Sequence, residues 1–299
     1  MIAKRLSKGD TIGIICPSHV FDEKRYAPGI ATIERLGFKV KLGANVSKDT
    51  YGFVASAEER ASDLNAMVSD DDVKMVLFGG GESAVEVLPL IDYDNIRRHP
   101  KLFSNYSDGT SILNMIHAQT GLVTYYGYGA SQFFDLRYYD YMQFCSHFVE
   151  GYSSEQFFSN STWLTMRGGN CEGTLIGGYS LLFGLLLSNR NFKFDEDKKY
   201  LLFLEDHEIF SNVGTVNTCL SFIEQSTFFN NVTGLIFGHY AENLPDDLLH
   251  CLQRFGIRNK IPVVYTDDFG HENTRHAIFP IGIKATLDAD KQTLIFNGE

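Results

Sequence analysis

The sequence predicts an α/β protein, with a doubly wound, mostly parallel sheet in an amino-terminal domain and a mixed α/β carboxy-terminal domain. Strand and helix patterns alternate through the first half, which is typical of βαβ units. The 299 residues, 44% of them hydrophobic, can fill one large core or two ordinary ones. Between about residues 135 and 170 the sequence becomes aromatic and polar with weak periodicity, which favours a connecting segment. We therefore expect domains at 1–150 and 171–299, joined by a linker at 151–170.

In the first half, short apolar runs predict strands and amphipathic stretches predict helices between them. After the last of these runs come three glycines and a helix start at Glu82. In open parallel sheets, ligands bind beyond the carboxyl ends of the strands, so the glycines are candidates for a site. The expected strands are 11–16, 38–42 and 73–78, and the expected helices are 24–36 and 57–67.

The second half predicts a separately cored mixture of strands and helices. It begins with 173-GTLIGGYSLLFGLLL-187, which we interpret as a glycine-rich turn followed by a helix. The tail, 277–296, predicts strands around an Asp-Ala-Asp-Lys turn. Between them we expect strands at 200–205, 234–238 and 261–266, a helical stretch to about residue 225 and a helix near 244–255.

Charge and composition exclude several classes of protein. Lys and Arg total 26 against 37 Asp and Glu, so the net charge is 26 − 37 = −11, and nucleic-acid binding is not expected. No apolar run reaches the roughly 20 residues of a membrane span, and residues 1–15 lack signal-peptide features, so we expect a cytoplasmic protein. The five cysteines form no CxxC pair, which argues against disulfides and zinc. We expect no metal and no cofactor.

The stretch 104-SNYSDGTSILN-114 places Ser107 between an apolar run and the first turn of a helix. The free N–H groups of a helix start stabilise nearby negative charge, which would favour a nucleophile at this turn. The alternative is that Ser107 only caps the helix, because helix starts routinely carry Ser, Asp or Thr.

A nucleophilic serine needs a base and a carboxylate that orients the base. Glu205 ends the apolar run 200-YLLFLE-205, and His271 follows the run 261-IPVVYT-266 after a polar loop. Taken singly, each of these positions is a weak signal, because nine histidines give many chance placements.

Together with their flanking residues, these positions resemble the LD-carboxypeptidase family of serine peptidases, which includes the microcin C self-immunity peptidases. The resemblance runs nearly end to end, and the residues around Ser107, Glu205 and His271 are jointly specific. It is carried by 10-DTIGIICPS-18, 54-VASAEERASDLNAMVSDDDVKMVLFGGGES-83, 89-PLIDYDNIRRHPKLFSNYSDGTSILN-114, 121-GLVTYYG-127, 173-GTLIGG-178, 200-YLLFLED-206 and 269-FGHENTRHAIFPIGIKATLD-288.

The resemblance implies a triad of Ser107 as nucleophile, His271 as general base and then acid, and Glu205 as the orienting carboxylate. It also implies an active site built between two domains, and a homodimer. The backbone N–H of Asp108, with one from the Gly79–Gly81 turn, would form the oxyanion hole.

The two candidate donors in that glycine turn are Gly80 and Gly81. The chain departs from the family's pattern at three positions, where the family commonly has glycine, a β-branched residue, and asparagine or cysteine. These positions are Asn105, Gly109 and Tyr179.

Three further residues are candidates for substrate binding. Glu208 lies near the proposed carboxylate, Arg275 could pair with a substrate carboxylate, and Trp163 could stack on a ligand. For each, the ordinary alternative is a solvated or space-filling side chain. Asp267, Asp268 and His239 could suggest a metal, but a serine triad needs none.

The resemblance implies a hydrolase that cleaves an amide bond next to a terminal carboxylate. Its substrate would be either the L,D bond of muropeptides in peptidoglycan recycling or the acyl-sulfamoyl amide of a processed peptidyl-nucleotide antibiotic. A non-enzymatic binding protein on the same fold is the alternative from another class. In each case the partner is a small molecule.

Overall fold

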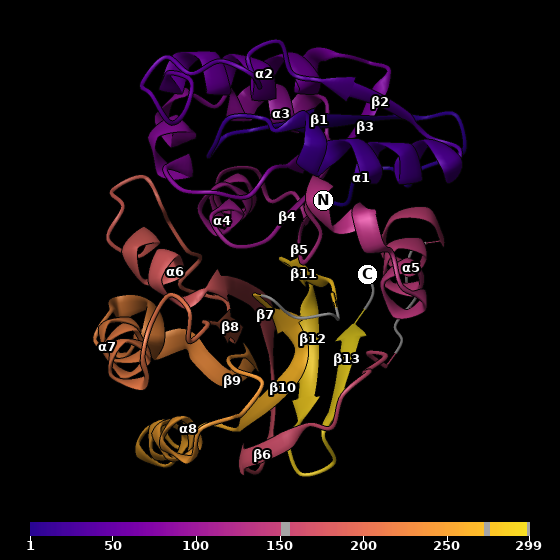
Figure 1. Ribbon diagram of the computed structural model, residues 1–299. Coiled ribbons are helices and arrows are strands. Elements are labelled where there is room, and N and C mark those ends of the chain that lie inside the picture. The colour runs from indigo at the N-terminus through magenta and orange to yellow at the C-terminus, as the bar shows by residue number, and fades with distance from the viewer. Residues whose placement is uncertain (151–155, 272–275, 298–299) are drawn as a thin grey trace. The chain divides into compact units, whose positions relative to one another are not determined.

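The computed structural model describes residues 1–150, 156–271 and 276–297. The chain divides into two compact units, Met1–Gly151 (unit 1) and Tyr152–Glu299 (unit 2). Each unit has a β-sheet covered by helices (Figure 1), so the predicted two-domain α/β fold class is confirmed. Within the described ranges, no helix is both long and apolar enough to cross a membrane.

The sheet of unit 1 is parallel, with the order β5-β4-β3-β1-β2. Its central strands are almost wholly buried, because helices cover both faces. Figure 1 shows α2 and α3 on one side of β1 and β3, and α1 on the other. The strands are β1 (Thr11–Ile15), β2 (Lys39–Leu42), β3 (Val73–Phe78), β4 (Leu102–Asn105) and β5 (Thr124–Tyr126).

Helices connect these strands and follow the last of them. The helix expected at Glu82 begins two residues later as a 3-10 helix. The helices of unit 1 are α1 (Glu23–Arg35), α2 (Ala57–Ser69), the 3-10 helix η1 (Ala84–Leu90), α3 (Tyr93–Arg98), α4 (Gly109–Thr120), the 3-10 helix η2 (Ala130–Asp135), α5 (Tyr138–Phe144) and the π-helix η3 (Cys145–Glu150).

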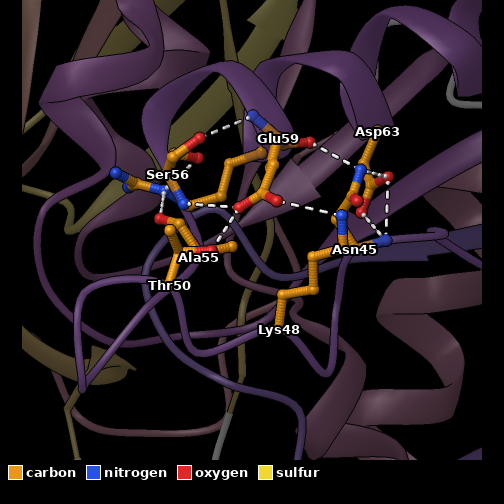
Figure 2. A network of polar contacts seen from close by, with 8 residues as sticks. Asn45, Lys48, Thr50, Ala55, Ser56, Glu59 and Asp63 are labelled. Carbon is orange, nitrogen blue, oxygen red and sulfur yellow. Dashed lines mark hydrogen bonds and ion pairs between the residues drawn. The ribbon is translucent and has the colours of Figure 1, made fainter.

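A polar network fixes the start of α2 against the loop that follows β2 (Figure 2). Ser56 and Glu59 form a capping box, in which each side chain accepts a hydrogen bond from the other's backbone N–H. The Glu59 carboxylate also accepts bonds from Thr50 Oγ1, 2.5 Å away, and from Lys48 Nζ, 2.9 Å away. These hydrogen bonds, led by the one from Thr50, lower the pKa of Glu59 to about 2.

The segment after about residue 135 was expected to be a connecting segment and not a core element, but its first part forms α5 and η3 and contributes buried side chains. Their aromatic side chains pack edge to face with those of the preceding segment. Phe144 lies 5.5 Å from Phe133 and 5.6 Å from Phe148 between ring centroids, and all three are buried. Helix formation here depends on this tertiary packing, which a weakly periodic sequence does not reveal.

The described part of unit 2 forms a seven-stranded mixed sheet with the order β13-β12-β7-β8-β9-β10-β6. Strands β7 to β10 are parallel, whereas β6, β12 and β13 pair antiparallel. The strands are β6 (Leu164–Arg167), β7 (Asn170–Tyr179), β8 (Tyr200–Glu205), β9 (Val232–His239), β10 (Val263–Gly270), β12 (Lys284–Asp288) and β13 (Thr293–Asn297), with the short β11 (Phe279–Ile281) before β12.

Residues 173–178 were expected to form a turn, but they belong to strand β7. The helix expected after them is present as α6. Figure 1 shows α6, α7 and α8 side by side along the parallel strands. The helices of unit 2 are α6 (Ser180–Leu186), α7 (Val213–Glu224), the 3-10 helix η4 (Thr227–Asn231) and α8 (Asp246–Asn259).

Candidate active site

Ser107 lies in the turn between β4 and α4, so the predicted strand-to-helix turn is confirmed. Its backbone adopts a left-handed conformation with φ of 55°, which is uncommon for a residue other than glycine. Such strain persists only where surrounding contacts impose it. Nucleophilic serines of α/β-hydrolases sit on the same kind of strained turn, which presents the hydroxyl at the sheet edge.

Contacts within unit 1 hold the Ser107 backbone from both sides. Its N–H donates to the Tyr126 hydroxyl, 3.0 Å away, at the end of the neighbouring strand β5. Its carbonyl accepts from the Thr110 N–H at 3.0 Å and from the Thr110 hydroxyl at 2.6 Å. Tyr126 was not among the predicted site residues, although its place at the end of a short apolar run was an available signal.

Asp108 links this turn to the start of η1, which follows the glycine turn after β3. Its buried carboxylate accepts a hydrogen bond of 2.7 Å from the Ala84 N–H, and burial raises the pKa of this carboxyl. Among the described residues, none accepts a hydrogen bond from the Asp108 amide. This N–H can therefore donate to a bound ligand, and the oxyanion role that the resemblance implies for it stays a prediction.

The two glycines predicted as oxyanion donors differ in their surroundings. The Gly80 N–H faces the hydroxyl of Tyr26, which pairs with His19 Nε2 at 2.9 Å. Gly81 has a φ of 147°, and a Cβ there would lie 2.5 Å from the Ser18 carbonyl oxygen. Gly81 must therefore be glycine for the turn to form.

In unit 2, Glu205 and His271 form a buried pair. Glu205 is the last residue of β8 and is 0% exposed, and His271 directly follows β10 and is 6% exposed. Glu205 Oε2 lies 2.7 Å from His271 Nδ1. An ionised carboxylate only accepts hydrogen bonds, so Nδ1 carries the proton and Nε2 is the nitrogen that can take a second one.

Two aromatic rings flank the His271 imidazole. Tyr179 and Phe210 both contact it in T-shaped geometry, with centroid distances of 5.1 Å and 5.0 Å. Tyr179 is one of the positions at which the chain departs from the family's pattern, and it borders the buried pair. Together the two rings restrict the rotation of the imidazole about its side-chain bonds.

A second carboxylate, Asp206, lies beside the pair and is also fully buried. It accepts hydrogen bonds from the His207 N–H at 2.8 Å and the Ser211 hydroxyl at 2.7 Å. Burial raises the pKa of Asp206, and the neighbouring charge of Glu205 raises it further. The neighbouring strand β9 has Gly238 beside Glu205, and a Cβ on this glycine would lie only 2.9 Å from the Glu205 Cβ. The absence of a side chain at Gly238 therefore leaves space for Glu205.

The candidate substrate-binding residues have different surroundings. Glu208 is exposed, three residues after Glu205. Trp163 is 3% exposed, and its indole N–H donates to Asp268 at 2.8 Å. Arg275 lies outside the described residues. Within the described ranges, no three His, Cys, Asp or Glu side chains are grouped to hold a metal ion.

Known protein families that match this sequence show the family to which the chain belongs. The sequence profile of the LD-carboxypeptidase N-terminal domain matches residues 12–127, and that of the LD-carboxypeptidase C-terminal domain matches residues 172–287. The chain therefore belongs to the LD-carboxypeptidase family of peptidases, and the resemblance noted in the sequence is confirmed.

Particular relatives match over nearly their whole length. The probable murein peptide carboxypeptidase of Bacillus subtilis is 31% identical, over 98% of this chain and 93% of its own. The microcin C7 self-immunity protein MccF of Escherichia coli is 25% identical, over 98% of this chain and 95% of its own.

Solved structures have the same fold. An MccF-like protein from Bacillus anthracis has a TM-score of 0.91 and 25% identity, with 100% of both chains covered. MccF in complex with aspartyl sulfamoyl adenosine has a TM-score of 0.86, with 100% of this chain and 99% of that chain covered. At 22% identity, the second likeness shows the fold alone.

Proposed function

We propose that this chain is a serine peptidase that cleaves an amide bond next to a terminal carboxylate, with Ser107, His271 and Glu205 as its catalytic triad. The observation that carries the proposal is the buried pair of Glu205 and His271, joined at 2.7 Å. A buried carboxylate on Nδ1 leaves Nε2 as the base that a serine nucleophile requires. The strained turn at Ser107 supports the assignment of the nucleophile.

The reaction has two halves. In the first, the Ser107 hydroxyl oxygen attacks the amide carbonyl while His271 Nε2 takes the hydroxyl proton, and the imidazolium then gives that proton to the departing amine. In the second, His271 Nε2 removes a proton from water as the water oxygen attacks the acyl-enzyme ester, and the imidazolium then gives that proton to the departing Ser107 oxygen, which restores the hydroxyl. Glu205 stabilises the imidazolium in both halves.

Backbone donors stabilise the negative oxygen of each tetrahedral intermediate. The Asp108 N–H is one donor, and an N–H from the Gly79–Gly81 turn is the other. Each such donor contributes on the order of 3 kcal/mol to the transition state. Since the Gly80 N–H faces the Tyr26 hydroxyl, Gly81 is the donor that we favour in this turn.

Our first candidate substrate is the bond between an L-centre and a terminal D-amino acid in a muropeptide. The 31% identity to a probable murein peptide carboxypeptidase supports this choice. The second candidate is an acyl-sulfamoyl nucleoside, because MccF has been solved with aspartyl sulfamoyl adenosine and is related to this chain at 25% identity.

The test is to incubate the purified protein with an L,D-tetrapeptide and, separately, with aspartyl sulfamoyl adenosine, and to identify products by mass spectrometry. Loss of the terminal D-residue from the first supports the carboxypeptidase, and release of aspartate from the second supports the immunity-type activity. Ser107→Ala is the inactive control, and Ser62→Ala, an exposed serine of α2, is the matched control that should keep full activity. Binding without turnover of either compound would instead favour a binding protein.

A further inference from the structure

Strand β10 departs from its neighbour just before His271. Tyr265 pairs with Phe237 of β9, and the next pair is Gly270 with His239. Residues 266–269 of β10 therefore stand opposite the single residue Gly238 of β9. An insertion of this kind bends a strand and changes the direction of the side chains that follow it. The first side chain after the bulge is that of His271.

Asp268 anchors the bulge on one side. Its carboxylate is 0% exposed and accepts hydrogen bonds from Ser159 Oγ at 2.7 Å, the Asn160 N–H at 2.9 Å and Trp163 Nε1 at 2.8 Å. The Thr266 hydroxyl, within the bulge, donates to it at 3.1 Å. These donors join the bulge to the segment that leads into β6, which is more than 100 residues earlier in the chain.

A carboxylate at position 268 can accept more hydrogen bonds than a neutral side chain of the same size. Among the described residues, no cationic side chain forms an ion pair with Asp268. Burial of a carboxylate without a cation is costly unless several donors satisfy its oxygens. A neutral side chain could fill the same space, but it could not accept as many hydrogen bonds and so could not hold the bulge as firmly.

Asp267 anchors the bulge on the other side. Its Oδ1 accepts from the Tyr265 hydroxyl at 2.7 Å and lies 2.8 Å from His239 Nδ1. His239 ends β9, and its Cβ lies 3.1 Å from where a Cβ of Gly270 would be. The backbone just before His271 is thus closely packed against the backbone and Cβ of His239, whose imidazole contacts Asp267.

We propose that Asp268, held by the Trp163 indole, is a positioning residue that fixes the bulge and thereby sets the angle at which His271 meets Glu205. The carboxylate of Asp268 acts through the backbone of residues 268–271 and does not touch substrate. Trp163, which the sequence suggested as a stacking surface for a ligand, then serves the site through its N–H. The effect on catalysis rests on the proposed function, whereas the effect on the Glu205–His271 hydrogen bond does not.

The first test is spectroscopic and needs no substrate. An imidazole N–H bonded to a buried carboxylate gives a far-downfield proton resonance, which is assigned here by its loss in His271→Gln. We expect this signal to be weakened or shifted in Trp163→Phe, which keeps the ring and removes one donor, and to be lost in Asp268→Asn. An unchanged signal in both folded variants would overturn the proposal, whether or not the wild-type protein cleaves any substrate.

The second test is kinetic and uses whichever substrate the wild-type protein cleaves. We expect kcat to fall about 10-fold in Trp163→Phe and on the order of 100-fold in Asp268→Asn with KM nearly unchanged, because small misplacements of a catalytic group have effects of this size. The acidic limb of the kcat/KM profile should move to lower pH, since Glu205 stabilises the imidazolium less well. If the acidic limb does not move in these variants, and activity falls only in proportion to the unfolded fraction, then Asp268 has a purely structural role.

Asp288→Asn is the matched control. Asp288 accepts the Lys291 N–H at 2.9 Å in the turn between β12 and β13, away from the bulge. The same chemical change there should lower stability and leave the downfield signal and kcat as they are. Equal effects of Asp288→Asn and Asp268→Asn on the signal would contradict the proposal. If Asp268→Asn does not fold, Trp163→Phe alone decides.

Discussion

At the scale of single residues, the left-handed backbone of Ser107 gives a prediction that separates catalysis from stability. Ser107→Ala should abolish hydrolysis and leave the fold intact, because it removes only the hydroxyl. Ser107→Gly should also be inactive, but more stable than Ser107→Ala by up to about 1 kcal/mol, since glycine adopts positive φ without strain. Urea denaturation of the two variants measures the difference. A less stable glycine variant would show that the turn does not store strain.

The Glu205–His271 pair predicts which of two substitutions lowers kcat more. Glu205→Gln should reduce kcat less than His271→Ala does, because an amide oxygen still accepts a hydrogen bond from the Nδ1–H group whereas a missing base has no substitute. Steady-state kinetics of both variants at one pH provide the comparison. The reverse order would mean that the wrong glutamate has been assigned, and the exposed Glu208 would be tested next.

At the scale of elements, the start of α2 has a pH-dependent stability. The hydrogen bonds to Glu59 lower its pKa to about 2, against an ordinary value of 4.5 in the unfolded chain. Its contribution is therefore fully present above pH 4.5 and is lost as the pH falls through about 2. Glu59→Gln should lower the Tm at pH 7, and this deficit should shrink between pH 4.5 and pH 2.

The measurement is a series of thermal melts of wild type and Glu59→Gln across that range. Glu58→Gln, one residue earlier in the same helix, is a matched control that lies outside the network of Figure 2. A Tm difference that stays constant with pH would show that the ionised form of Glu59 has no special role in the capping box.

The elements also show what sequence patterns could and could not predict. The βαβ alternation and the turn at Ser107 were predicted because each depends on neighbours in the chain. Residues 173–178 were misassigned because their glycines serve strand packing instead of a turn. A Cβ on Gly177 would lie 1.8 Å from the Phe203 carbonyl oxygen of β8. That requirement comes from a partner strand and is invisible in a local pattern.

Ser107, Glu205 and His271 were predicted as a site because each lies at or after the end of an apolar run and because their flanks resemble a family. The structure brings Glu205 and His271 together, and the catalytic role of all three residues stays a prediction. The supporting contacts of Tyr126 with Ser107 and of Trp163 with Asp268 were not found. Each joins segments that are distant in the chain, by 19 and 105 residues. Only the folded structure brings such pairs together.

At the scale of the whole molecule, we expect a homodimer in which each active site is complete within one chain. The described part of unit 2 exposes apolar side chains on α6 and α7, with Leu185 60% and Phe222 70% exposed. Exposed apolar surface of this kind favours burial against a partner. Light scattering at micromolar concentration should give about twice the mass of one chain, and a fully active monomer would contradict the expectation.

A mixing experiment tests whether the sites are shared between chains. Ser107→Ala and His271→Ala chains, unfolded together and refolded, should give no activity, because no single chain then holds all three catalytic groups. Wild type mixed with either variant is the control and should retain activity in proportion to its share. Restored activity in the double-variant mixture would show instead that each site takes residues from two chains.

The strand order of unit 2 also determines when this half can fold as the ribosome makes it. Strands β1 to β5 are all synthesised within the first 126 residues. Strand β6, in contrast, pairs with β10, whose first residue lies 263 − 167 = 96 positions after the end of β6, so this pairing cannot form until those residues have been made. At roughly 5–20 residues per second, that wait is about 5–20 seconds. During this interval the apolar β8 and β9 have emerged without β10 beside them. We therefore expect the half of the nascent chain that holds Glu205 and His271 to be the half that aggregates more readily during synthesis.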